Sequence, residues 1–373
     1  MSKYLGAVAL RGCPHLLKIR SQLIALIMVF LFCTFNLAVV HQHQLLQLQP
    51  AYHHEEVGLT HTTNQTVSLL PQKKATLCTV IKDPHKRYID EWADYHMALG
   101  FTGLRLYDNT DEFVLKDWGT NKTYAAQIDR IHFIPDVTHN ITRFEGVKSE
   151  VQSEAFMDCI RNAIENDANW VAGFDLDEFL VLRNSTSITT FMDQYCKYPC
   201  DQISFNWLMF GPSNRTKYKP VPVTKRFQIR IPHGDENLVK GIVNPKAVDS
   251  TSFWVHTFPM KAPYLWLDTT GKSIKAQNWQ RWLRLANPNN PQDVAVIHHY
   301  KTLSEEEWHD KNCVRQDVNN LPMPCDEKTA AQTLATFNVK GYREIYDDTA
   351  WLILKMLLPE YAIYDRLDIE ELG

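Results

Sequence analysis

The feature that most constrains this chain is an alternation of β and α patterns over residues 75–182. Segments rich in β-branched and apolar residues alternate with segments whose apolar residues recur at helical spacing. The predicted strands are residues 75–83, 102–109 and 125–135, and the predicted helices are residues 87–100 and 150–168. Such alternation predicts an α/β fold with a mostly parallel sheet flanked by helices.

Acidic residues stand at the ends of predicted strands, above all in "GFDLDEFLVL", residues 173–182. Ligands bind beyond the carboxyl ends of parallel strands, so Asp108, Asp175 and Asp177 predict a site there. In an extended segment Asp175 and Asp177 would point the same way. Two convergent carboxylates repel unless a cation lies between them. Oxygen ligands suit Mg²⁺ or Mn²⁺, which also bind substrate phosphates, and a sugar nucleotide would supply these. The competing interpretation is a solvated turn that caps a helix.

The N-terminal part differs in composition from the rest. Residues 22–40 are nearly all apolar and long enough to span a bilayer as a helix. Basic residues precede this run and are absent after it until Lys73, which predicts a cytosolic N-terminus and a lumenal remainder. A cleaved signal peptide is the alternative, although the cleavage site would be poor. The predicted parts are a tail (1–21), a single-pass membrane anchor (22–40), an exposed stem (41–75), a main domain (76–345) and a C-terminal helix packed on it (346–373).

The bulk composition limits the function. A chain of 373 residues with 45% hydrophobic residues can bury a large core. Its formal net charge of −4 argues against a general nucleic-acid binder, which would usually carry a basic face.

Sequons and cysteines also favour a lumenal domain. All five Asn-x-Ser/Thr sequons follow the apolar run, at Asn64, Asn121, Asn140, Asn184 and Asn214. Six of the eight cysteines follow it too, and an oxidising lumen permits disulfides. Cys196 with Cys200, and Cys313 with Cys325, predict local loops. For Cys78 and Cys159, buried thiols are favoured over a disulfide, which the even number of cysteines also permits.

Six sequence blocks occur in a fixed order: "EWADYHMALGF", "LYDN", "GFDLDEF", "WLMFG", "VKGIVNP" and "HHYKTLSEEEW". In this order they resemble the blocks of glycosyltransferase family 92, over roughly residues 76–312, with family-2-like glycosyltransferases as near neighbours. The resemblance implies a GT-A type nucleotide-sugar-binding fold, a divalent metal and an inverting transfer. Members of the family transfer galactose from UDP-galactose onto glycans.

The resemblance also implies roles for matching residues. Asp175 and Asp177 correspond to the metal and diphosphate site, and Glu178 to the acidic residue that follows it. Nucleotide contacts are implied for four residues near the first two strands: Lys82, Asp83, Asp108 and Asn109.

The last block departs from the family pattern. His298 stands where an Asn is expected, and Leu303 where a Lys is expected, so the donor sugar or the acceptor can differ. His299 is a candidate third metal ligand or diphosphate contact, with ordinary packing as the alternative.

The remaining candidates are charged residues in "PHGDENLVKG". Asp235 and Glu236 are candidates for the carboxylate base that deprotonates an acceptor hydroxyl, with a polar turn as the alternative. Lys240 is a candidate point charge on the diphosphate, unless it is a solvated surface lysine.

The sequence and the resemblance therefore predict a transferase that depends on Mn²⁺ or Mg²⁺ and moves a sugar onto a glycan or glycoprotein. The expected sugar is galactose, with UDP-galactose as its donor. It would lie in the Golgi membrane as a type II protein. A glycoside hydrolase would need carboxylates farther apart, across a sugar. The other alternative is a membrane-anchored glycan-binding module or inactive transferase relative.

Overall fold

The computed structural model describes residues 73–83, 85–131, 151–232, 238–249, 256–274, 286–315 and 345–367. Clustering of contacts divides the chain into Met1–Ser68 and Leu69–Gly373, and the described residues all belong to the second unit. The predicted tail, anchor and most of the stem lie outside them, as do Asp235 and Glu236. No helix in the described ranges has the length and the apolar run needed to cross a bilayer.

The central feature is a mixed sheet whose strands lie in the order β3-β2-β1-β4-β8-β6-β10-β5, with β9 paired to β6. Its strands are β1 (Ala75–Ile81), β2 (Gly103–Asp108), β3 (Ala126–Arg130), β4 (Trp170–Gly173), β5 (Glu178–Leu182), β6 (Gln202–Met209), β8 (Val239–Val243), β9 (Trp266–Asp268) and β10 (Ala295–His299). A separate small sheet pairs β7 (Ile229–Arg230) with β11 (Ile345–Tyr346).

The strand pairings confirm a mostly parallel sheet. Strands β1 to β4 run in one direction. Strand β8 is antiparallel to both β4 and β6, so β6 shares the direction of β4. Strands β9 and β10 are parallel to β6, and β5 is antiparallel to β10. Only β5 and β8 are therefore reversed within the described sheet.

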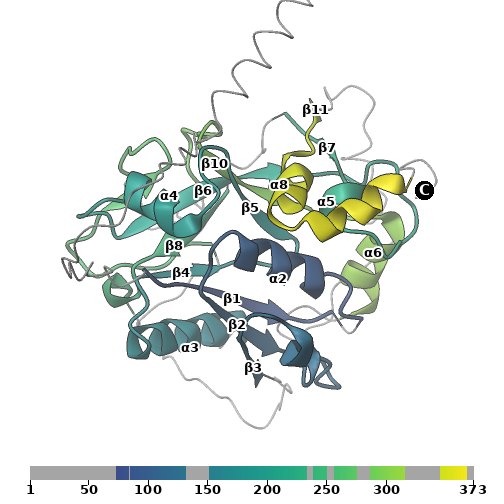
Figure 1. The fold of residues 1–373 in the computed structure, drawn as a ribbon. Coiled ribbons are helices and arrows are strands. Elements are labelled where there is room, and N and C mark those ends of the chain that lie inside the picture. The colour runs from purple at the N-terminus through teal and green to yellow at the C-terminus, as the bar shows by residue number, and fades with distance from the viewer. Residues whose placement is uncertain are drawn as a thin grey trace, which may run out of the picture. The chain divides into compact units, whose positions relative to one another are not determined.

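Helices cover both faces of the sheet (Figure 1). The α-helices are α2 (Ile89–Ala98), α3 (Val151–Glu165), α4 (Ile188–Tyr195), α5 (Val223–Arg226), α6 (Glu305–His309) and α8 (Thr349–Leu357). The 3₁₀ segments are η1 (Trp118–Asn121), η2 (Pro245–Ala247) and η5 (Pro359–Arg366), and η4 (Asp310–Val314) is a π-helical turn.

Strand β1 shows how the two faces differ. Leu77 and Ile81 belong to the large apolar cluster that includes α2 and α8, whereas Cys78 belongs to the cluster around α3. This alternation follows from the two-residue period of a strand, and both sets are buried because helices lie on both faces.

Hydrogen bonds from two side chains of helix α2 hold β5 in place. The indole Nε1 of Trp92 donates to the carbonyl of Glu178 at 3.0 Å, and the hydroxyl of Tyr95 donates to the carbonyl of Leu180 at 2.9 Å. Both aromatic side chains are fully buried. The helix ends before Gly100, whose φ of +96° favours glycine. Burial of this aromatic face therefore fixes the strand that follows the acidic turn.

Predicted and observed elements agree in kind but differ at their ends. The helix predicted at 87–100 is shorter, and the strand predicted at 125–135 ends at Arg130 within the described residues. The predicted C-terminal helix is divided: α8 ends at Leu357, and a 3₁₀ segment starts at Pro359, whose ring cannot continue the helix. Trp351 and Leu354 of α8 are buried against the core.

The prediction for Cys78 and Cys159 is wrong, because the two form a disulfide between β1 and α3. Both are buried, and a strand and its covering helix bring together cysteines that are 81 residues apart. The local pair Cys196–Cys200 is confirmed. Cys313 is also disulfide-bonded, and Cys325 lies outside the described residues.

Candidate active site

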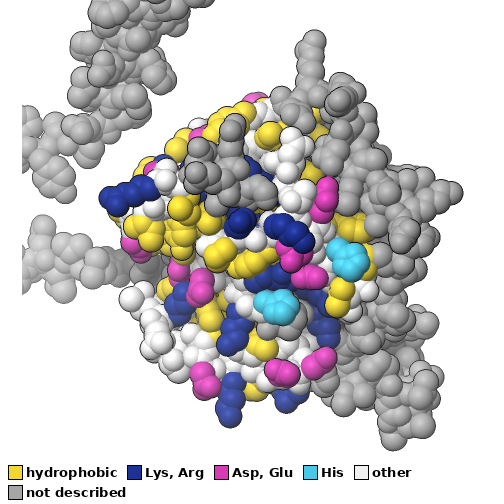
Figure 2. All heavy atoms as spheres, turned by 90° about the vertical axis from the view of Figure 1, so that its right-hand side faces the viewer, with side chains coloured by type: hydrophobic (Ala, Val, Ile, Leu, Met, Phe, Trp, Pro, Cys, Tyr) yellow, Lys and Arg dark blue, Asp and Glu magenta, His cyan; other side chains and the backbone are white. Residues whose placement is uncertain are grey.

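A pocket of about 330 Å³ opens at the carboxyl ends of β1, β4 and β10. This is the edge at which α/β sheets bind ligands. Figure 2 views the side toward which the arrowheads of β1 and β2 point in Figure 1, and there basic, acidic and histidine side chains lie close together. The predicted site residues Lys82, Asp83, Asp175, Asp177 and His299 all line this pocket.

The acidic residues lie in a tight turn between β4 and β5. The backbone N–H of Asp175 donates to Oε2 of Glu178 at 2.9 Å, and the N–H of Glu178 donates to the carbonyl of Asp175 at 3.0 Å. The carbonyl of Asp177 accepts from the N–H of Tyr300 at 2.8 Å. Glu178 is thus a positioning residue, because its buried carboxylate closes the turn that carries both aspartates. Burial raises the pKa of Glu178 well above its usual value, although Lys240 opposes the shift.

The carboxylate of Asp177 lies between an imidazole and an ammonium group. Its Oδ1 is 3.6 Å from Nε2 of His299, and its Oδ2 is paired with Nζ of Lys311. Although burial opposes this, Lys311 and His299 hold the pKa of Asp177 well below its usual range. Burial lowers the pKa of His299 despite the neighbouring carboxylate, so its imidazole is neutral near neutral pH.

The carboxylate of Asp175 has different partners. Its Oδ1 accepts from Nε2 of Gln152 at 2.8 Å, and its Oδ2 is 3.0 Å from Nζ of Lys240. Lys240 comes from β8, is buried, and also lies 3.3 Å from Glu178. Burial opposes protonation of Lys240, yet Asp175 and Glu178 raise its pKa above the usual value. The interpretation of Lys240 as a solvated surface lysine is therefore wrong.

Strand pairing explains how His299 reaches Asp177. Strand β5 leaves the neighbourhood of β4 and pairs with β10 at the far edge of the sheet, where His299 stands opposite Glu178. A short turn thus connects two strands that are far apart in the sheet, and its aspartates face the end of β10.

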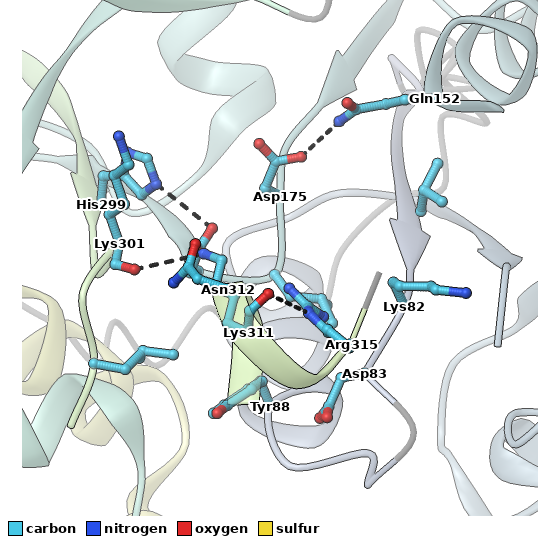
Figure 3. Close-up of a pocket in the computed structure, with 14 residues that line it drawn as sticks. Lys82, Asp83, Tyr88, Gln152, Asp175, His299, Lys301, Lys311, Asn312 and Arg315 are labelled. Atoms are coloured by element: carbon cyan, nitrogen blue, oxygen red, sulfur yellow. Dashed lines mark hydrogen bonds and ion pairs between the residues drawn. The ribbon is translucent and has the colours of Figure 1, made fainter. Parts of the chain in front are cut away.

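Basic side chains surround the acidic ones. Lys82, Lys301, Lys311 and Arg315 line the pocket together with Asp83, Asp175 and Asp177 (Figure 3). Lys311 and Asn312 come from the π-helical turn η4, and Arg315 follows it. Such turns often occur at functional sites. A pocket that combines several cationic groups with a carboxylate–imidazole pair suits a phosphate-bearing ligand accompanied by a metal ion.

Two of the predicted nucleotide contacts lie elsewhere. Asp108 is fully buried, and its oxygens accept from the backbone N–H groups of Thr110 at 2.8 Å and Leu115 at 2.7 Å. Neither Asp108 nor Asn109 lines the pocket, although Nζ of Lys82 donates to the carbonyl of Asn109 at 3.2 Å. Asp83 does line it, but its carboxylate accepts from the backbone N–H of Arg87 at 2.8 Å.

The predicted metal ligands converge only in part. Among the described residues no group of three or more His, Cys, Asp or Glu side chains is arranged to hold a metal ion. Asp177 and His299 approach each other, whereas Asp175 lies 3.0 Å from Lys240. Asp175 also accepts a hydrogen bond from Gln152 (Figure 3). Asp177 and His299 fit a divalent ion that takes its other ligands from donor phosphates and water.

Of the two departures from the family pattern, only Leu303 lines the pocket. His298 is fully buried on the other face of β10, with its ring 4.6 Å from that of Phe210 and its Nε2 3.8 Å from Asp347. Its unusual identity therefore concerns the core and not the pocket.

Sequence reasoning missed several lining residues: Tyr88, Gln152, Lys301, Lys311, Asn312 and Arg315. The one local feature that could have indicated any of them is "DKNCVR", in which Lys311 and Arg315 lie on either side of Cys313. Nothing near Gln152 or Tyr88 marks them out, because the tertiary fold alone places them at the pocket.

The fold and the pocket define an α/β protein with a charged pocket at the carboxyl ends of its strands, and comparisons name its family. Residues 76–329 match the family model described as glycosyltransferase family 92. The chain belongs to this family. It is 25% identical over 187 residues to a family 92 protein of Oryza sativa subsp. japonica, covering 50% of this chain and 29% of that protein. It is also 24% identical over 234 residues to a family 92 protein of Ricinus communis, and this match covers 60% of this chain and 34% of that protein.

The chain thus spans about a third of the length of the curated relatives it matches. Among solved structures, it is similar to HddC from Yersinia pseudotuberculosis with 8% identity, a TM-score of 0.26, and coverage of 52% of this chain and 85% of that one. At so low a TM-score, the likeness carries no argument about this chain.

Proposed function

We propose that the chain is a metal-dependent glycosyltransferase that takes a sugar from a nucleotide-sugar donor. The observation that supports this most is the Asp177–His299 pair, 3.6 Å apart, in a pocket that Lys82, Lys301, Lys311 and Arg315 also line. Carboxylate and imidazole can hold a divalent ion, and the cationic side chains can bind a diphosphate. Membership of family 92 supports sugar transfer as the reaction.

The proposal extends to fold type and donor. The mostly parallel sheet, with its site at the carboxyl edge, is compatible with the GT-A type fold that the family resemblance implies. UDP-galactose is the proposed donor, and a glycan or glycoprotein is the proposed acceptor.

In this proposal Asp177 and His299 hold Mn²⁺ or Mg²⁺. When bound, the ion would act as a Lewis acid on the diphosphate leaving group. Lys311, which now neutralises Asp177, lies on the pocket wall and can turn its ammonium group to the diphosphate. Lys240 and Gln152 orient Asp175, which can accept a hydrogen bond from the donor.

Transfer would invert the anomeric carbon by direct displacement, with a carboxylate base that removes the acceptor proton. Asp235 and Glu236 remain the predicted candidates for that base. Localisation in the Golgi membrane as a type II protein is part of the same proposal. It is supported by the apolar run at 22–40, by the disulfides, and by the exposed sequon residues Asn121, Asn184 and Asn214.

The test uses the full chain purified in detergent. Release of UDP or GDP is measured from a panel of nucleotide sugars with a mixture of N-glycans as acceptor, with Mn²⁺, with Mg²⁺ and with chelator. The expected result is release from one donor that chelator abolishes and added Mn²⁺ restores. Equal release with chelator would refute the metal-dependent mechanism. No release from any donor by protein that still binds glycans would favour the glycan-binding relative instead.

A further inference from the structure

A second pocket of about 520 Å³ lies at the amino ends of the parallel strands, opposite to the ends that form the candidate active site. Residues just before β1, β4 and β6 line it, together with residues just after the reversed strand β8. The lining residues are Lys73, Ala168, Asn169, Trp170, Asp193, Cys196, Lys197, Tyr198, Cys200, Asp201, Asn244 and Lys246. None of them lines the candidate active site.

Tyr198 projects from the rim of this second pocket. Its side chain is 98% exposed, more than any other large hydrophobic side chain in the described ranges. It lies in the short loop that the Cys196–Cys200 disulfide closes, and both cysteines are buried. An exposed aromatic ring does not stabilise the core. On a loop closed by a disulfide it offers a flat contact surface that loses little conformational entropy when a ligand binds.

Hydrogen-bond donors also line this pocket. The side-chain oxygen of Asn169 accepts from the backbone N–H of Lys74 at 2.8 Å, and that of Asn244 accepts from the N–H of Lys246 at 3.1 Å. Within the described ranges neither N–H₂ group donates a hydrogen bond, so both can donate to a ligand. Trp170 is 8% exposed, and its indole Nε1 has no hydrogen-bond partner among the described residues.

The charged side chains that line this pocket are Lys73, Lys197, Lys246, Asp193 and Asp201, and two of the three lysines are paired with carboxylates. Lys73 pairs with Asp193, and Nζ of Lys246 is 2.9 Å from the carboxylate of Asp167. Asp201 accepts from the backbone N–H of Leu265 at 3.1 Å. The candidate active site is lined by four cationic side chains and three carboxylates, so the two linings have the same formal net charge. Because carboxylates hold two of its three lysines, the second pocket suits a neutral ligand rich in hydroxyls.

We infer that the second pocket binds a neutral oligosaccharide, with the ring of Tyr198 against the apolar face of a sugar and the amides of Asn169 and Asn244 donating to its hydroxyls. Sugars combine a C–H face with a rim of hydroxyl groups, which is the combination that an exposed aromatic ring and planar amides recognise. Binding here does not depend on the proposed transfer reaction. If the chain is a transferase, this site would hold a part of the acceptor remote from the reacting sugar.

The test measures oligosaccharide binding by the full chain in detergent, with chelator and without nucleotide. The probes are fluorescently labelled chitotetraose, cellotetraose, mannopentaose and a neutral biantennary N-glycan, followed by fluorescence anisotropy. At least one should bind, and Tyr198→Ala should weaken the best binder by about tenfold because stacking is lost. Tyr198→Phe keeps the ring and should keep most of the affinity.

Tyr346→Ala is the matched control, since Tyr346 is 64% exposed and lines neither pocket. It should bind like the parent. Parent-like binding by Tyr198→Ala, or no binding of any probe by the parent, would overturn the inference. Binding of a peptide with the sequence of residues 41–72, in place of every oligosaccharide, would overturn it as well. Nucleotide release is assayed separately, and Tyr198→Ala should leave hydrolysis of the nucleotide sugar unchanged. Failure of the transferase proposal would therefore be distinct.

Discussion

Two acidic turns at the carboxyl edge of the sheet look alike in sequence and differ in structure. After β2, Asp108 accepts hydrogen bonds from the backbone N–H groups of Thr110 and Leu115, and it is fully buried. After β4, Asp177 faces the side chains of His299 and Lys311, the latter 134 residues away. One carboxylate is satisfied by its own loop, whereas the other is satisfied by distant side chains.

The difference indicates which carboxylate can exchange its partners. Backbone donors of a closed loop cannot leave without unfolding that loop, so Asp108 has a structural role. The ammonium group of Lys311 is on a flexible stem in an open pocket, so it can make way for another cation. A strand-end aspartate is therefore a candidate for ligand binding only where its partners are mobile.

The largest expected effect belongs to Asp177→Asn. Loss of the carboxylate removes a proposed metal ligand, so nucleotide release with the best donor should fall by about 10²–10³-fold. The protein should still fold, because Lys311 can reach water. Asp167→Asn is the control, since Asp167 also pairs with a lysine but does not line the candidate active site. Parent-like activity in Asp177→Asn would contradict the assignment.

Asp108→Asn should act on stability and not on ligand binding. The asparagine amide has only one oxygen, so its NH₂ group would face one of the two backbone N–H donors and that hydrogen bond would be lost. The free energy of unfolding should therefore fall by about 1.5–3 kcal/mol. Urea unfolding would measure it, with Asp117→Asn, an exposed aspartate of the same loop, as control. The folded variant should bind the donor as the parent does. A specific loss of donor affinity with normal stability would instead favour the nucleotide contact implied by the family resemblance.

The neighbours His298 and His299 extend the comparison to pH. Burial lowers the pKa of His298 from 6.5 to about 3. Between these two pH values the imidazole is protonated in the unfolded chain but neutral in the folded chain. Stability is therefore present above the unfolded pKa and is lost as pH falls below it. From about pH 7 to about pH 5 the loss should be roughly 2 kcal/mol.

Asp347, Arg183 and Arg230 also act on His298, but burial has the largest effect. His298→Asn should reduce the difference in urea stability between the two pH values by about that amount. His309→Asn, at an exposed histidine, should leave it unchanged. An identical pH dependence in His298→Asn and the parent would show that other groups dominate.

The smallest expected effect is that of Lys311→Met on the nucleotide-free protein. Removal of the ammonium group leaves Asp177 without its present counter-charge, so Mn²⁺ affinity should rise roughly fivefold to tenfold. Affinity for UDP should fall, because a phosphate partner is lost. Electron paramagnetic resonance of free Mn²⁺ measures the first quantity and calorimetry the second. Lys301→Met removes an equal charge from the same pocket and should weaken UDP binding without strengthening Mn²⁺ binding.

Much of the fold could be predicted from local sequence. The strand and helix patterns of residues 75–182 are correct in kind, because periodicity and turn residues act within a few positions. The family blocks identified the family correctly. The ends of helices and strands were less accurate, as at α8, where Pro359 stops the helix.

The pairing of cysteines was harder to predict. Cys196–Cys200 could be predicted from its short loop, but Cys78–Cys159 could not. No local pattern states that a strand and a helix 81 residues apart will pack face to face.

By itself, the sequence determined the family, the α/β class and the acidic turn that carries Asp175 and Asp177. Only the tertiary structure decided that β5 crosses to β10, that His299 and Lys311 meet Asp177, and that Asp108 turns inward. The physical reason is that local propensities act over a few residues. A binding site, in contrast, depends on which distant segments bury their apolar faces together, and that choice is made by the core as a whole.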